Sequence, residues 1–259
     1  MKRKLTSLLV VILMITLVVS SYSCSSMNKY FIRSPYNTND DTTEKIEAFD
    51  TLEEAKTRVE GIKQLGYVVY DGRGKVAYHP FETLGQSRIL YKAKSVADYI
   101  ESNGYTYGNA TVNPAYDRGK TEKLVSCDRF VEWAIFDAGY VKDNNEDSVL
   151  ALYPHGDKIN IETYLIRNGF TKIEDISQVQ GGDVIFVGDS QEHSPNLPRE
   201  LWDYPDHVFI CAGSSGSSTF YRYDAGSTRR IQSIQPSNEP LEYPGKEFRF
   251  AYRAPAELP

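Results

Sequence analysis

The chain has 259 residues and a formal net charge of −6, and 25% of its residues are charged. A mildly acidic chain of mixed charge lacks the basic surface that nucleic acids require, so we expect no nucleic acid among its partners. Its length suffices for one medium-sized domain with a smaller module, and we expect a monomer.

The N-terminal segment, residues 1–26, has the organisation of a secretory signal peptide. Basic residues precede an uncharged apolar run, Leu8–Val19, and small and polar residues follow it. The run is shorter than the roughly 20 apolar residues that span a bilayer, and an uncleaved anchor is the alternative. Cys24 lies in a sequence that resembles a lipoprotein processing site. Lipid attachment at Cys24 and free secretion both remain open, and either leaves a secreted or cell-surface protein.

Two segments precede the region that we expect to be catalytic. Residues 27–46 are rich in Asn, Asp and Thr, which predicts a polar linker. Residues 47–82 predict a small helix-and-hairpin module. Thr51 and Glu54 have the spacing of a capping box, and apolar residues recur at helical spacing over 52–65. This module is either a folded spacer or a binding module.

A helix predicted over 95–103 is followed by a second helix that begins at Cys127. Ser126 is a favoured helix N-cap, and apolar residues recur on one face over 130–138. A thiol in the first helical turn faces the positive end of the helix dipole, which favours the reactive thiolate. The alternatives are that Cys127 is a small buried hydrophobe or that it forms a disulfide with Cys211.

A histidine and an acid lie on two neighbouring predicted strands. His207 begins a strand of alternating pattern, and a turn rich in Ser and Gly leads to a partner strand over 219–225. Asp224 lies near the end of that partner strand. The hairpin can bring His207 and Asp224 together, so that the acid orients the imidazole and the imidazole serves as a base for Cys127.

In this order, the motifs resemble the NlpC-like cysteine peptidases of bacterial cell walls. The matching positions are Tyr116, Gly119, Cys127, Ala138-Gly139-Tyr140, Gly182-Asp183 and His207-Val208. The resemblance covers roughly the C-terminal two-thirds of the chain. It implies an α+β, papain-like catalytic domain over 84–259, in which the helix that carries the cysteine packs on an antiparallel sheet.

The resemblance also implies a role for each matching side chain. Cys127 would attack a peptide carbonyl, His207 would take and return the proton, and Asp224 would orient His207. Tyr116 would contact the oxyanion or the substrate. This chemistry needs no cofactor, and the 4 histidines of the chain do not have the spacing of metal ligands.

The sequence departs from these peptidases around the nucleophile. Relatives commonly have Asp-Cys-Ser-Gly where this chain has Ser126-Cys127-Asp128-Arg129. That aspartate helps to receive the free amine of a stem peptide, so strict specificity for an N-terminal L-Ala-γ-D-Glu unit is in doubt here. Ser126, Asp128 and Arg129 are candidates for substrate contacts, with an ion pair as the alternative for Arg129. The loop over 189–204, which contains Trp202, is either a roof over the cleft or an inert insertion.

The predicted reaction is hydrolysis of an amide bond in peptidoglycan stem peptides through a thioester on Cys127. Three other functions are compatible with the same residues. A CHAP-type N-acetylmuramoyl-L-alanine amidase would use Cys and His in the same way but cut the amide between sugar and peptide. A noncatalytic wall-binding protein would keep only the fold, and an acyltransferase would pass the acyl group to an amine instead of water.

Overall fold

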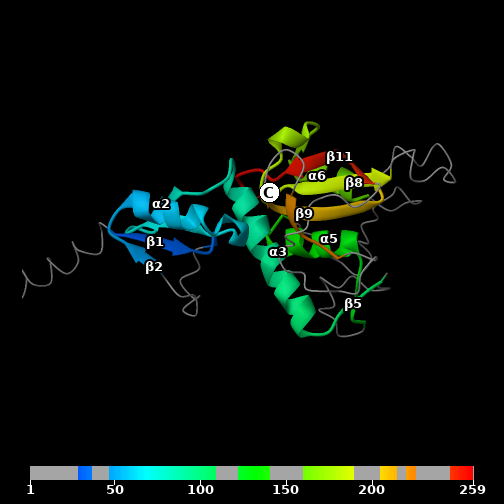
Figure 1. Ribbon diagram of the computed structural model, residues 1–259, viewed down its shortest axis with the longest axis horizontal. Helices are drawn as coiled ribbons and strands as arrows, with labels where there is room; N and C mark the ends of the chain where they lie inside the picture. Colours follow the sequence, from blue (N-terminus) through cyan, green and yellow to red (C-terminus); the bar gives the residue numbers. More distant parts are fainter. Residues whose placement is uncertain are drawn as a thin grey trace, which may run out of the picture. The chain divides into compact units, whose positions relative to one another are not determined.

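The computed structural model describes residues 29–36, 47–108, 122–140, 160–189, 205–214, 220–225 and 246–258. They form a mixed α+β structure in which the larger sheets are antiparallel (Figure 1). The expected signal peptide, Cys24, Tyr116, Gly119 and Trp202 lie outside these residues. Within the described part of the chain, none of the helices combines the length and apolar character needed to cross a membrane.

The chain divides into two compact units. Unit 1 comprises Met1–Gly61 and Tyr67–Pro80, and unit 2 comprises Ile62–Gly66 and Phe81–Pro259. The short segment Ile62–Gly66 therefore belongs to unit 2, although the residues on both sides of it belong to unit 1. This segment contains the 3-10 helix η1 (Lys63–Leu65).

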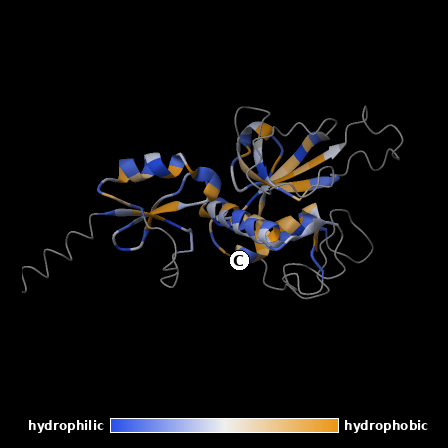
Figure 2. Cartoon of the chain, turned by 60° about the horizontal axis from the view of Figure 1, so that its bottom comes forward, coloured by the Kyte–Doolittle hydropathy of each residue, from blue (hydrophilic) through white to orange (hydrophobic). Residues whose placement is uncertain are grey.

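In its described residues, unit 1 is a four-stranded antiparallel sheet with one helix. Its strand order is β2-β1-β3-β4. The elements are β1 (Tyr30–Arg33), β2 (Glu47–Phe49), α2 (Leu52–Glu60), β3 (Val68–Asp71) and β4 (Val76–Tyr78). Ala55 and Val59 of α2 are fully buried, whereas the opposite side of the helix is polar. Figure 2 shows this alternation of hydrophilic and hydrophobic residues along α2 and α3, as expected for helices with one buried face.

The predicted capping box of α2 is confirmed, but the predicted length of the helix is wrong. Thr51 Oγ1 accepts from the backbone N–H of Glu54 at 3.3 Å, and Glu54 Oε2 accepts from the N–H of Thr51 at 3.3 Å. The helix ends at Glu60 instead of continuing to Leu65, because Gly61 interrupts it and the chain resumes as η1.

The predicted polar linker over 27–46 is wrong for Tyr30–Arg33, whereas residues 27–28 and 37–46 lie outside the described part of the chain. Tyr30–Arg33 forms β1, which lies between β2 and β3 in the sheet of unit 1. Its sequence, Tyr-Phe-Ile-Arg, is rich in residues that favour strands, and Ile32 pairs with Val69 in the buried middle of the sheet. The many Asn, Asp and Thr residues further along the segment concealed this short strand.

Unit 2 contains a five-stranded antiparallel sheet with the order β10-β9-β8-β11-β7. Its strands are β7 (Thr171–Ile173), β8 (Val184–Asp189), β9 (His207–Ser214), β10 (Phe220–Tyr223) and β11 (Lys246–Arg253). Besides η1, the helices described in unit 2 are α3 (Leu84–Ser102), α5 (Cys127–Asp137), α6 (Ile161–Arg167) and η2 (Ile176–Gln178). A two-residue parallel ladder joins β5 (Thr106–Tyr107) to β6 (Leu124–Val125).

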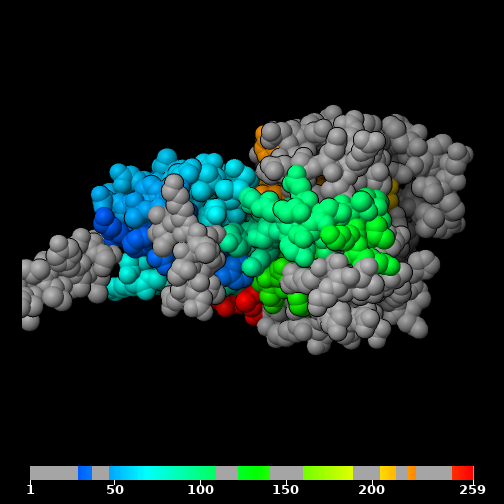
Figure 3. Space-filling model, turned by 90° about the horizontal axis from the view of Figure 1, so that it is seen from below, coloured from blue at the N-terminus to red at the C-terminus, as the bar shows by residue number. Residues whose placement is uncertain are grey.

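The main core of unit 2 lies between the two long helices and one face of the sheet. Helix α5 packs against both α3 and β9. Val208 and Ile210 of β9 belong to this core, whereas Phe209 and Cys211 belong to a smaller core on the other face. This division follows from the alternation of side chains along a strand. The outer side of α3 remains at the surface, as the green band in Figure 3 shows.

Helix α3 is longer than the predicted helix over 95–103, because it begins at Leu84 with a second capping box. Thr83 Oγ1 accepts from the N–H of Gln86 at 3.2 Å, and Gln86 Oε1 accepts from the N–H of Thr83 at 2.9 Å. The first turn is nevertheless buried, since Gly85, Gln86 and Ser87 are enclosed by the rest of unit 2.

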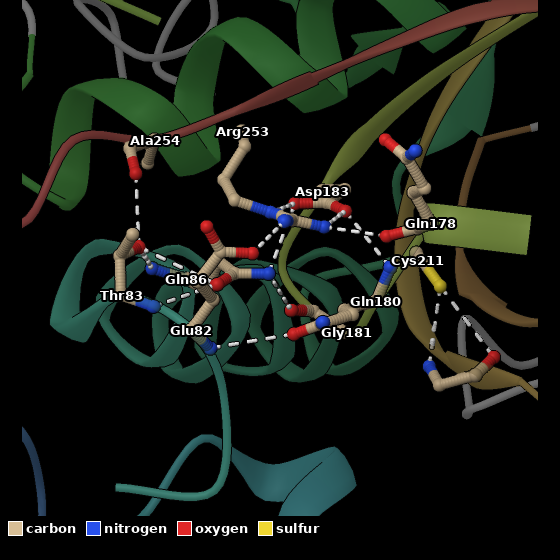
Figure 4. A network of polar contacts seen from close by, with 11 residues as sticks. Glu82, Thr83, Gln86, Gln178, Gln180, Gly181, Asp183, Cys211, Arg253 and Ala254 are labelled. Carbon is tan, nitrogen blue, oxygen red and sulfur yellow. Dashed lines mark hydrogen bonds and ion pairs between the residues drawn. The ribbon is translucent and has the colours of Figure 1, made fainter. Parts of the chain in front are cut away.

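A buried polar network ties this first turn to β8 and β11 (Figure 4). Arg253 donates to Asp183 through Nε at 3.1 Å and Nη2 at 2.8 Å, and Gln86 Nε2 donates to the same carboxylate at 3.0 Å. Burial raises the pKa of Asp183 to about 6, although Arg253 acts in the opposite direction. Gly182 has φ +85°, and a Cβ there would lie 2.3 Å from the backbone oxygen of Gln86. The Gly-Asp pair thus fixes the start of β8, the strand that pairs with β9.

Candidate active site

The start of α5 places Cys127 at the end of the β5–β6 ladder. Val125 of β6 pairs with Tyr107 of β5, and Ser126 then turns the chain into the helix with extended backbone angles of φ −100° and ψ 172°. The N–H of Phe130 donates to the carbonyl of Ser126 at 2.9 Å, which closes the first turn. Cys127 is the first residue of the helix, as predicted, and is 5% exposed.

Ser126 occupies the predicted N-cap position, but its hydroxyl has a different partner. The hydroxyl makes no hydrogen bond to the backbone of the helix and instead donates to Asp128 Oδ1. The same carboxylate oxygen accepts from the N–H of Arg129 at 2.9 Å. Ser126 therefore holds the Asp128 carboxylate in the first turn of α5, where a negative charge is stabilised by the helix dipole.

His207 and Asp224 lie together, as the predicted hairpin requires. His207 is the first residue of β9, opposite Val187 of β8, and Asp224 follows the last residue of β10. His207 Nε2 lies 3.0 Å from Asp224 Oδ2, and the two side chains are 8% and 9% exposed. Tyr223, which precedes the acid, is buried and donates to the carbonyl of Gln64 at 3.1 Å. That bond fixes the end of β10 and, with it, the position of the carboxylate.

The pKa of His207 shows that the thiol of Cys127 interacts with the His207–Asp224 pair. Burial opposes a charge on the imidazole, but the charge and hydrogen bond of Asp224, followed by a hydrogen bond and charge from Cys127, raise the pKa of His207 to about 10. Cys127, His207 and Asp224 thus form one interacting cluster, although they come from α5, β9 and the end of β10. Because Nε2 faces Asp224, Nδ1 is the ring nitrogen left for Cys127.

Tyr107 is a fourth member of the cluster, and sequence reasoning missed it. Burial raises the pKa of the Tyr107 phenol, and so do the charges of Cys127, Asp128 and Asp224 and a hydrogen bond with Cys127. The tyrosine expected at this place was Tyr116, which lies outside the described residues. A signal was present, because Tyr107 is also followed by glycine upstream of the cysteine.

Arg129 forms the ion pair that was the alternative to a substrate contact. Its Nη1 lies 2.8 Å from Glu132 Oε2, one turn further along α5, and the two side chains are only 5% and 1% exposed. A guanidinium that is enclosed by protein and paired with a buried carboxylate stabilises the helix and is not exposed to a substrate. We therefore remove Arg129 from the candidate substrate-binding residues.

Cys211 does not belong to the cluster. It lies in the middle of β9 and in the smaller core, on the face opposite Val208 and Ile210. Complete burial strongly raises the pKa of its thiol. Cys127 and Cys211 are both free, so the disulfide alternative is wrong.

The cluster unites a thiol at a helix N-terminus, an imidazole and a carboxylate that orients the imidazole. This arrangement is suited to nucleophilic attack on an acyl group. Among the described residues, no group of three or more His, Cys, Asp or Glu side chains is placed to hold a metal ion. The chain matches no known family model, and no curated protein and no solved structure is significantly similar to it.

Proposed function

We propose that the chain is a cysteine peptidase that hydrolyses amide bonds in peptidoglycan stem peptides. The observation that carries this proposal is the convergence of Cys127, His207 and Asp224, with His207 Nε2 at 3.0 Å from Asp224 Oδ2. Together with the order of the sequence motifs, the position of α5 against β9 supports a papain-like arrangement. The substrate class rests on the resemblance of these motifs to NlpC-like peptidases, which act outside the cell membrane.

In the reactive form the proton of the Cys127 thiol already resides on His207, so that a thiolate faces an imidazolium, in keeping with the raised pKa of His207. Asp224 stabilises this imidazolium through its contact with Nε2. The thiolate attacks the carbonyl carbon of the amide, the C–N bond breaks, and His207 gives its proton to the leaving amine. A water molecule then attacks the thioester while His207 accepts a proton from it. The carboxylic acid leaves, and the thiol of Cys127 is restored.

The tetrahedral intermediates carry a negative oxygen that needs hydrogen-bond donors. The first N–H groups of a helix have no partner within the helix, so the backbone N–H of Cys127 is one donor. We assign the second to the hydroxyl of Tyr107, whose pKa is raised in part by its interaction with Cys127 and whose residue pairs with Val125 in the β5–β6 ladder. Tyr107 thus takes the role that the sequence motif gave to Tyr116.

The test is mass spectrometry of purified peptidoglycan after incubation with the full chain. We expect new fragments from cleavage within the stem peptides with the wild type and none with Cys127→Ala. Cys211→Ala is the matched control, because it removes the other buried thiol without touching the cluster, and it is expected to cleave like the wild type.

The other outcomes separate the competing functions. Release of intact stem peptides from the sugar would show that the protein is an amidase and not a peptidase. Products in which an added amine has replaced water would indicate an acyltransferase. Binding of the wall without any covalent change, across several wall types, would contradict a catalytic role.

A further inference from the structure

Arg222 approaches the acid of the cluster from its own strand. It belongs to β10, two residues before Asp224, and pairs with Cys211 of β9. Its Nε lies 3.5 Å from Asp224 Oδ2, the same oxygen that lies 3.0 Å from His207 Nε2. The guanidinium carbon lies 5.7 Å from the centre of the Phe209 ring, and the side chain is 11% exposed. One carboxylate oxygen is therefore shared between an imidazole and a guanidinium.

This sharing has an electrostatic consequence. When His207 is protonated, two positive groups face the single negative charge of Asp224. Arg222 then both competes for the shared oxygen and repels the imidazolium. These effects are strong here, because the carboxylate and both of its partners are nearly enclosed by protein, where charges are poorly screened.

We propose that Arg222 is a positioning residue that limits how firmly the Asp224–His207 pair holds the second proton of the imidazole. The catalytic meaning of this role rests on the proposed peptidase function, but the effect on His207 does not. Arg222 acts on His207 through the carboxylate that they share and through its own charge. Without it, His207 would keep its proton to a higher pH and return it to a leaving amine less readily.

Other charged or titratable groups surround the pair. From α5 these are Cys127 and Asp128, from β5 Tyr107, and from α3 Asp98, whose charge acts on Tyr223 beside the acid. Asp206 is the chain neighbour of His207. Because all of them stay the same when only Arg222 is changed, a change in the titration of His207 is attributable to Arg222.

The experiment is an NMR titration of the histidine side chains in the full chain carrying Cys127→Ala. This parent lacks the proposed nucleophile, so the measurement does not depend on activity. The His207 signal is identified by its loss on an added His207→Gln substitution. Adding Arg222→Gln is expected to raise the pKa of His207 by about one unit. Adding Arg222→Lys, which keeps the charge, is expected to leave the pKa close to that of the parent.

Two results would overturn the proposal. One is an unchanged or lowered pKa of His207 in the glutamine variant, and the other is an equal rise in the lysine variant. If the glutamine variant does not fold, Arg222→Met carries the same test, because its unbranched side chain still covers Phe209. A failure here leaves the peptidoglycan digest unaffected, and a failed digest leaves this titration valid, so the two proposals fail separately.

Discussion

Nε2 of His207 lies 3.0 Å from Oδ2 of Asp224, and both side chains are almost completely enclosed. Asp224 is thus the main source of the raised pKa of His207, since burial alone would lower it. The β9–β10 hairpin thus determines the protonation of His207, on which the chemistry proposed for Cys127 depends.

Replacing Asp224 by Asn should remove most of the support for the imidazolium while preserving the shape of the side chain. We expect kcat/KM for a stem peptide to fall by about 100-fold or more, in the range typical of lost acid–base assistance. Asp50→Asn is the matched control, because Asp50 is a largely exposed carboxylate of unit 1 that pairs with Lys29. Equal activities of the two variants would show that Asp224 does not orient the base.

The pH profile should follow the protonation of His207. Its pKa is raised from the ordinary value of 6.5 to about 10, so the ring is charged below that range and loses its proton as the pH rises through about 10. Because the proposed active form is the thiolate–imidazolium pair, kcat/KM should fall on the alkaline side near pH 10. In Asp224→Asn this alkaline limb should move to lower pH. Activity that instead rises through pH 10 would contradict the ion-pair mechanism.

Tyr107→Phe should impair the chemical step and leave the fold intact, since the ring is retained. Loss of one donor to a developing oxyanion typically lowers kcat by about 100-fold, and KM should change less. Tyr99→Phe is the control, because Tyr99 is 38% exposed on α3 and is not part of the cluster. A normal kcat for Tyr107→Phe would remove Tyr107 from the oxyanion site.

Glu132→Gln should destabilise the protein, because it leaves the buried guanidinium of Arg129 without its counter-charge. Removal of one partner of a buried ion pair typically lowers the free energy of unfolding by about 3–5 kcal/mol. Urea unfolding followed by circular dichroism measures this loss. Glu101→Gln, at an exposed position of α3, should change stability by no more than about 0.5 kcal/mol. A loss equally small in Glu132→Gln would show that the pair does not stabilise α5.

The helix start at Cys127 and the hairpin of His207 and Asp224 were predictable because each has a local signal. An N-cap serine before an apolar face fixes the start of α5, and a turn rich in Ser and Gly between two alternating segments fixes the hairpin. The capping box of α2 was predictable for the same reason. These signals lie within a few residues of the structure that they determine.

The missed elements depend on contacts between distant or very short segments. Tyr107 reaches the thiol only because β5 pairs with β6, and strands of two residues are too short to show a period. The first turns of α3 contain Gly85, Gln86 and Ser87, which tertiary packing buries. None of the three is strongly hydrophobic, so the sequence does not indicate that they are buried. Arg222 has the spacing of a same-face neighbour of Asp224, but only the pairing of β10 with β9 brings His207 to the carboxylate oxygen that Arg222 also approaches.

Alkylation of the thiols by iodoacetamide near pH 6 shows whether Cys127 and His207 form one reactive pair. Peptide mapping by mass spectrometry reports Cys127 and Cys211 separately in the native wild type and in His207→Gln. We expect Cys127 to be modified while Cys211 is spared, and modification of Cys127 to become several-fold slower in the variant. Equal rates for Cys127 in the two proteins would show that the thiol owes none of its reactivity to His207.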